Sequence, residues 1–194
     1  MILSLYNDLL STKIIASLKT EGRTVSYFYF DTLSQSKDKT TYRSLLSSLL
    51  LHIGLQFNQD ELKDLYQKYD SGRSQITTDA MKTTIIKLLT SAADAYILID
   101  AIDECESKDQ HLVAVFISEL LRLGPRIHIL ASCRYSVSSM GVITTGQKVY
   151  EIQLVEGVVN GDIQKHIQKA LNEFEFPEIM KEVEEALLAG AHGQ

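Results

Sequence analysis

The chain has 194 residues, of which 45% are hydrophobic and 23% charged, and its 19 basic and 25 acidic residues give a net charge of −6. The apolar content excludes a mainly disordered chain, and the length suits a single domain. The acidic balance argues against a nucleic-acid-binding module, and no apolar run approaches the ~18 residues of a membrane span. Cys105 and Cys133 lie too far apart for a metal-finger spacing. We therefore expect a cytoplasmic protein without a nucleic-acid or membrane partner.

Segments with helix spacing and short apolar or β-branched runs alternate along the chain. The predicted elements, in chain order, are a helix at 9–19, a strand at 24–30, a polar loop at 32–40, helices at 42–53, 59–69 and 78–89, a strand at 95–100, a helix at 110–123, strands at 126–131 and 149–154, and helices at 162–173 and 177–188.

Strands separated by helices imply parallel crossover connections, and therefore an α/β sheet. The apolar run at 95–100 does not alternate, which is typical of a strand buried on both faces, and the run at 126–131 is expected as a second buried strand. The alternating run at 149–154 is expected nearer an edge. One crossover, at residues 42–89, is unusually long and nearly all helical. The sequence predicts a single α/β unit over residues 1–194 with a helical insertion at about 42–89 and closing helices at about 162–189.

Polar side chains follow three of the predicted strands, at the edge where open parallel sheets bind their ligands. The first strand is followed by Asp31, and the strand at 126–131 by Ser132 and Arg134. The strand at 95–100 ends in Asp100, and two further acids, Asp103 and Glu104, come just after it. We therefore expect a site that draws on all three strands.

The sharpest motif is the apolar run that ends in Asp100, which has the Walker B arrangement. A carboxylate at that position can hold Mg²⁺ while the metal bridges nucleotide phosphates. The acids Asp103 and Glu104 just beyond could orient or deprotonate an attacking water. The alternative is that these two acids belong to a solvated loop that caps the next helix.

Arg134 is expected either as a sensor of the terminal phosphate or as a surface charge paired with a local acid. The Walker A string G-x-x-x-x-G-K-[ST], which cradles the phosphates, does not occur in these residues. Two other residues near the strand at 126–131 favour plain structural roles: His128 as a packed histidine, and Cys133 as a small apolar residue rather than a nucleophile.

Four stretches of the chain resemble the NACHT nucleoside-triphosphatase module of fungal STAND signalling proteins, in the version called the nephrocystin-3-like N-terminal domain. Residues 25–31 resemble its second strand, and residues 42–46 its "LRSLL" helix. Residues 95–105 resemble its "YIVIDALDEC" Walker B segment, and residues 127–134 its "hhhTSR" sensor strand. The last two stretches together are specific, and the first two support them. Ala101 stands where many wider NACHT relatives have Gly.

The resemblance implies a three-layer P-loop NTPase-like fold that works as a nucleotide switch with Mg²⁺ and ATP or GTP. Asp100 would hold the Mg²⁺, Asp103 and Glu104 would face the attacking water, and Arg134 would be the sensor that contacts the phosphate. The partners implied are flanking effector and repeat domains of a longer protein. Residues 9–19 resemble the helix that follows the P-loop, so the family's first, central strand and its P-loop are expected to be missing, with a gap left in the sheet.

Two functions follow from these expectations. The first is a fragment of a signalling NTPase that cannot bind ATP tightly as it stands and gains activity only with an upstream P-loop. The second is a degenerate, non-catalytic module for protein interaction or scaffolding, with no cofactor. Whether the chain is an enzyme stays open at this point, because the Walker B acids are present and Walker A is not.

Overall fold

The computed structural model describes residues 2–33, 39–134, 149–152 and 186. Residues Asn7–Val149 form one compact unit, and the other described residues belong to a second. The elements in chain order are α1 (Ile2–Thr20), β1 (Val25–Tyr29), α2 (Tyr42–Phe57), α3 (Gln59–Lys68), the 3-10 turn η2 (Asp70–Gly72), α4 (Thr78–Thr90), β2 (Ala95–Asp100), the 3-10 turn η3 (Ile102–Glu104), α5 (Ser107–Leu121) and β3 (Ile127–Ala131).

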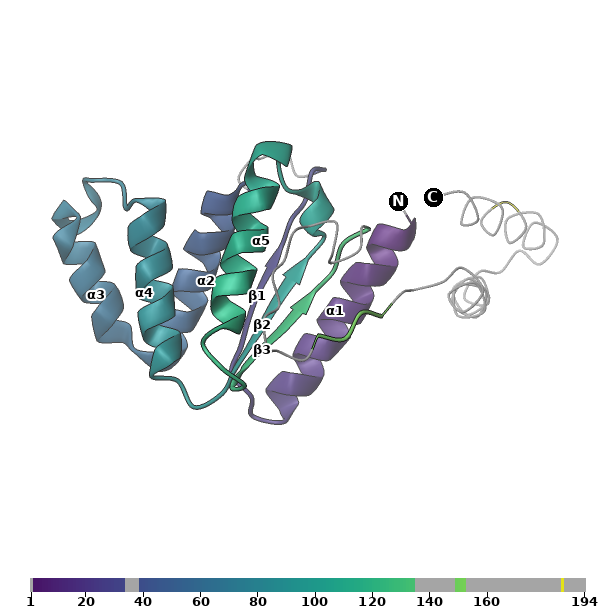
Figure 1. The fold of residues 1–194 in the computed structure, drawn as a ribbon, viewed down its shortest axis with the longest axis horizontal. Helices are drawn as coiled ribbons and strands as arrows, with labels where there is room; N and C mark the ends of the chain where they lie inside the picture. Colours follow the sequence, from purple (N-terminus) through teal and green to yellow (C-terminus); the bar gives the residue numbers. More distant parts are fainter. Residues whose placement is uncertain (1, 34–38, 135–148, 153–185, 187–194) are drawn as a thin grey trace, which may run out of the picture. The chain divides into compact units, whose positions relative to one another are not determined.

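The three described strands form one parallel sheet in the order β1-β2-β3. In the register, Tyr29 of β1 lies opposite Asp100 of β2, and Ile99 of β2 lies opposite Ala131 of β3. The connection from β1 to β2 contains α2, α3 and α4, and the connection from β2 to β3 contains η3 and α5 (Figure 1). Because all three strands run the same way, their carboxyl ends meet at one edge of the sheet, where the predicted site residues lie.

Helices cover both faces of this sheet, which gives the three-layer α/β arrangement that the sequence predicts (Figure 1). On one face, alternate strand residues such as Phe28, Ile97 and Ile99 pack with residues of α2, α4 and α5 in the main core. On the other face, Ile15 of α1 packs with Val25 and Leu98 in a smaller core. Asp100 follows Leu98 by two positions and so lies on the α1 face.

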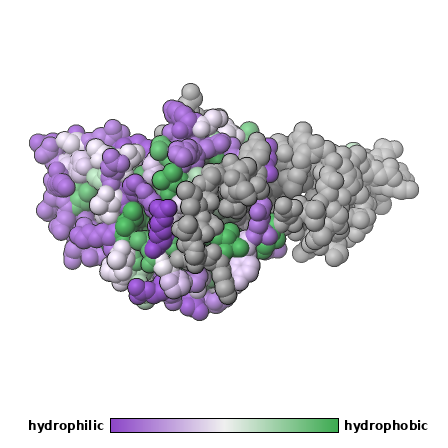
Figure 2. Space-filling view, viewed as in Figure 1, coloured by the Kyte–Doolittle hydropathy of each residue, from purple (hydrophilic) through white to green (hydrophobic). Residues whose placement is uncertain are grey.

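Side-chain caps explain where the helices of the insertion begin. Thr41 accepts a hydrogen bond from the backbone of Ser44 at the start of α2, and Asn58 and Thr77 cap α3 and α4 in the same way. Over α3 and α4, hydrophilic residues predominate on the face drawn in Figure 2, as expected of helices that turn one side to solvent. The helical insertion predicted at 42–89 is therefore made of three capped helices.

For the elements up to residue 131, the structure confirms the predicted order, with shifts at their ends. The strand at 95–100 has the predicted bounds. The helix α1 starts seven residues before the predicted position, since nothing before Gly22 breaks a helix, and α5 starts three residues earlier. The helix predicted at 162–173 lies outside the described residues, and of the helix predicted at 177–188 only residue 186 is described.

Three expectations about the strands are wrong. The described strands are hydrogen-bonded neighbours throughout, so the gap expected in the sheet is not found among them. The strand β3 lies at an edge of the described sheet and leaves Leu130 42% exposed, so it is not buried on both faces. Residues 149–152, the described part of the strand predicted at 149–154, adopt no regular structure, because an alternating pattern forms a strand only where a partner strand is available.

No helix among the described residues is long and apolar enough to cross a membrane.

Candidate functional site

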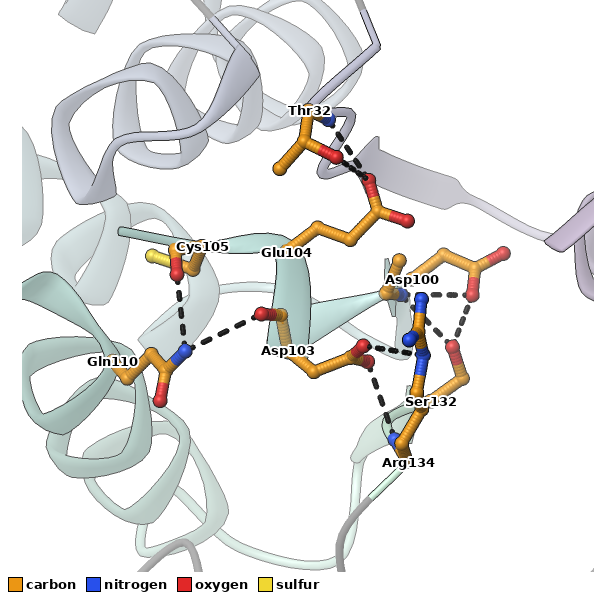
Figure 3. Close-up of polar contacts among 9 residues, drawn as sticks. Thr32, Asp100, Asp103, Glu104, Cys105, Gln110, Ser132 and Arg134 are labelled. Atoms are coloured by element: carbon orange, nitrogen blue, oxygen red, sulfur yellow. Dashed lines mark hydrogen bonds and ion pairs between the residues drawn. The ribbon is translucent and has the colours of Figure 1, made fainter. Parts of the chain in front are cut away.

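Polar side chains from η3 and from the ends of β1, β2 and β3 meet at the carboxyl edge of the sheet (Figure 3). Asp100 ends β2, and the left-handed residue Ala101 (φ 55°, ψ 49°) then turns the chain into η3, which carries Asp103 and Glu104. Ser132 and Arg134 follow β3, as the sequence predicts. The backbone fixes this turn against β3, because the amide of Ile102 donates to the carbonyl of Ser132 at 3.0 Å.

Asp100 is the buried centre of the site, with 1% of its surface exposed. Its Oδ1 atom accepts hydrogen bonds from the hydroxyl of Ser132 and from the backbone amide of Ala101, the latter at 2.9 Å. Its Oδ2 atom accepts a hydrogen bond of 2.5 Å from the hydroxyl of Ser11 on α1, which is itself only 6% exposed. Among the described residues, no Lys, Arg or His forms an ion pair with Asp100. The carboxylate is therefore held by hydroxyls and an amide from three elements, without a counter-charge.

Asp103 and Arg134 are paired with each other. Nε of Arg134 lies 2.9 Å from Oδ2 of Asp103, and the backbone amide of Arg134 donates to Oδ1 at 3.2 Å. The Asp103 side chain is only 10% exposed, whereas that of Arg134 is 74% exposed. Pairing with a local acid was one of the two roles expected for Arg134, and the structure shows that it occurs.

Glu104 points the other way, toward the end of β1 (Figure 3). Its Oε2 atom accepts hydrogen bonds from the backbone amide of Thr32 at 2.8 Å and from the Thr32 hydroxyl at 3.1 Å. Gln110 of α5 stabilises the end of η3, because its side-chain amide donates to the carbonyl of Cys105 at 3.0 Å. The turn η3 is thus tied to β1 through Glu104 and to β3 through Asp103. The helix α5 receives no side-chain cap from either acid, so they do not act as its N-cap.

The remaining sequence candidates have structural surroundings. His128 is half-exposed and stacks on Tyr96 with ring centroids 4.5 Å apart, so it is not a packed histidine of the core. Burial, and secondarily Asp109, raises the pKa of the Cys105 thiol to about 12, which keeps it protonated and unreactive. Cys133 is partly buried against the main core, as an apolar residue would be.

Two residues of the site were not singled out from the sequence. Ser11 lies on the face of α1 that also carries Ile15 and Leu18, so a hydroxyl on an otherwise apolar stripe was the signal that could have identified it. Thr32 gave no such signal, because it opens a polar loop in which Ser, Thr and Lys are ordinary.

Apart from the backbone amide of Ala101, the groups around the Asp100 carboxylate are hydroxyls, and oxygens are the ligands that Mg²⁺ prefers. Among the described residues, no group of three or more His, Cys, Asp or Glu side chains is arranged to hold a metal. A cation at this edge would therefore depend on one carboxylate, neighbouring hydroxyls, water and a ligand's phosphates, which is how Mg²⁺ is bound in nucleotide sites. The residues present fit such an ion.

Residues 9–134, well over half of the chain, match the family model described as nephrocystin 3, N-terminal. The chain belongs to this family. The matched region runs from α1 to Arg134 and therefore contains every residue of the site described above. No curated protein and no solved structure matched the chain.

Proposed function

We propose that residues 9–134 form the acid-bearing part of a nucleotide-dependent switch, in which Asp100 takes a Mg²⁺ ion and Arg134 a nucleotide phosphate. The observation that carries the proposal is the state of Asp100: it is 1% exposed, lies at the carboxyl end of the central described strand and has no ion-pair partner among the described residues. A buried negative charge is costly unless it is paired or binds a metal. A divalent cation at this edge would supply the missing charge.

The chain's own residues have separable tasks in this proposal. Asp100 would hold the ion, and the hydroxyls of Ser11 and Ser132, which already touch its carboxylate, would keep that carboxylate in place. When bound, Mg²⁺ would neutralise the charge that develops on a transferring phosphoryl group. Arg134, largely exposed just beyond the end of the neighbouring strand β3, would bind the phosphate. Glu104, at the same edge, is the candidate for orienting water, whereas the Asp103 carboxylate is held against Arg134.

The phosphate-binding half of a nucleotide site is not encoded in these 194 residues, which contain no G-x-x-x-x-G-K-[ST] string. We therefore propose that this chain alone binds Mg·ATP or Mg·GTP only weakly. Switch activity would need a P-loop from additional sequence, together with flanking effector and repeat domains that respond to the bound nucleotide, in the cytoplasm.

A second candidate is a non-catalytic module for protein interaction. One observation favours it: β1, β2 and β3 are hydrogen-bonded in unbroken order, which leaves no place between them for a further strand that could carry a P-loop. In this case the acids at the sheet edge would serve only to hold η3 against β1 and β3.

Transcript sequencing and turnover measurements separate the two candidates, and calorimetry tests the weak nucleotide binding proposed for this chain. The switch proposal predicts that the 194-residue chain shows no micromolar Mg·ATP affinity, and such an affinity lost in Asp100→Ala would refute that statement. Transcript sequencing across the locus should reveal an in-frame G-x-x-x-x-G-K-[ST] upstream. In the protein so encoded, Asp100→Ala and Arg134→Ala should each lower turnover by more than about tenfold, because both act on transition-state charge. Unchanged turnover in both, or no P-loop in any transcript, would favour the interaction module.

A further inference from the structure

The two acids of η3 have different surroundings, which suggests different roles. Glu104 contacts Thr32 at the end of β1, whereas both carboxylate oxygens of Asp103 contact Arg134 (Figure 3). The Asp103 side chain is 10% exposed, so little of it faces the solvent from which an attacking water would come. The structure therefore directs Asp103 toward an arginine rather than toward water.

The contact with Asp103 uses only part of the hydrogen-bonding capacity of Arg134. Asp103 engages Nε and the backbone amide, so the two terminal Nη groups are left for another acceptor, and none is recorded for them among the described residues. The Arg134 side chain is 74% exposed, which agrees with a guanidinium whose Nε is bound to Asp103 while its Nη groups face solvent. A guanidinium binds phosphate through such parallel N–H groups.

We propose that Asp103 is a positioning residue that orients the guanidinium of Arg134 for a phosphate-bearing ligand, and that it does not act on water. The proposal rests on the proposed function, because it assumes that Arg134 binds a phosphate. A free arginine side chain loses rotamer freedom when it binds, and this loss opposes binding. By fixing Nε and the backbone at once, Asp103 removes much of that cost before the ligand arrives.

A competing role for Asp103 has the opposite consequence. If the carboxylate occupied the guanidinium in place of the ligand, an anion would have to displace it, and neutralising Asp103 would raise the affinity for anions. If the carboxylate orients Arg134, neutralising it lowers the affinity even though a negative charge has been removed. The sign of the change in affinity for an anion therefore distinguishes a positioning residue from a competitor.

The first test uses nitrogen-15 NMR of the 194-residue chain and measures hydrogen exchange at the Nε–H group of Arg134. Arg122, an exposed arginine at the end of α5 whose side chain forms no hydrogen bond or ion pair with the other described residues, is the internal reference. We expect exchange at Arg134 to be at least tenfold slower than at Arg122, and Asp103→Asn to remove most of this difference. Glu104→Gln, which neutralises the adjacent acid, should leave Arg134 protected. Equal exchange at the two arginines of the unmodified chain would overturn the proposal, even if every variant failed to fold.

The second test titrates inorganic pyrophosphate at millimolar concentration and follows the backbone amide signal of residue 134, which every variant retains. The unmodified chain should bind through Arg134, and Asp103→Asn and Arg134→Lys should each weaken binding by about threefold or more, since lysine lacks the guanidinium fork. Tighter binding by Asp103→Asn would show that Asp103 competes with the anion and would overturn the positioning role. If pyrophosphate does not bind at Arg134 while the Nε–H group stays protected, the proposed function fails and the Asp103–Arg134 anchor stands as a structural contact alone.

Discussion

Ser11→Ala tests how strongly α1 is fixed to the buried carboxylate of Asp100. The Ser11 hydroxyl is 6% exposed and donates to a carboxylate that is 1% exposed, at 2.5 Å. Hydrogen bonds to charged groups contribute about 1.5–3 kcal/mol. Alanine recovers about 0.5 kcal/mol through its higher helix propensity. The net expectation is a loss of about 1–2.5 kcal/mol in the free energy of unfolding, or a fall of roughly 2–10 °C in the melting temperature for a chain of this size.

Urea unfolding followed by circular dichroism measures this loss, with the m-value checked for two-state behaviour. Ser17→Ala is the matched control, because Ser17 lies on the exposed side of the same helix and the same change there should be neutral or slightly stabilising. Ser11→Ala should lower the free energy of unfolding by less in the Asp100→Asn background than in the unmodified chain, since the charged acceptor of the Ser11 hydroxyl is then absent. If Ser11→Ala and Ser17→Ala gave the same stability, the contact between Ser11 and Asp100 would be refuted.

Two further predictions concern the turn after β2 and the β1 edge. Ala101→Gly should raise the free energy of unfolding by about 0.5–1 kcal/mol, because Ala101 has a φ of 55° that glycine adopts without strain; a loss of stability in urea would contradict this. His52→Gln tests a pH dependence: burial, and secondarily Lys19, lowers the pKa of His52, whose Nδ1 accepts from the amide of Tyr27 at 3.4 Å. The folded pKa of His52 lies below the unfolded value of about 6.5. The stability that the neutral His52 side chain contributes is therefore present above that pH and is lost as the pH falls through the folded pKa. The stability difference between the unmodified chain and His52→Gln should therefore narrow from pH 7.5 to pH 5, and a constant difference would refute the role of His52.

Much of the fold was predictable because its signals are local. The strand at 95–100 was predicted with its observed bounds, since a dense apolar run followed by Asp100 has few other interpretations. The meeting of Asp100, Ser132 and Arg134 at one edge followed from parallel topology alone, because the carboxyl ends of parallel strands share an edge. The resemblance to the nephrocystin-3-like N-terminal domain, carried by the Walker B and sensor stretches, is likewise confirmed by the family match.

The pairings inside the site were not predictable, because they join residues far apart in the chain. Nothing in the sequence near Ser11 indicates that it lies against Asp100, 89 positions away. The partner of Arg134 was open for the same reason, and the structure assigns it to Asp103. The exposure of β3 depends on what covers the sheet, which an apolar run cannot reveal. Periodicity identifies the elements and their order, whereas side-chain partners depend on tertiary packing.

The most direct test of the account is whether a divalent cation binds at Asp100. Mn²⁺, a paramagnetic substitute for Mg²⁺, broadens NMR signals close to its binding site, even when binding is weak. The account predicts that micromolar Mn²⁺ broadens the amide signals of Ala101 and Ser132 first, that excess Mg²⁺ restores them, and that Asp100→Ala abolishes the effect. Broadening spread over the acidic surface, or unchanged by Asp100→Ala, would contradict the assignment of this sheet edge as a cation and nucleotide site.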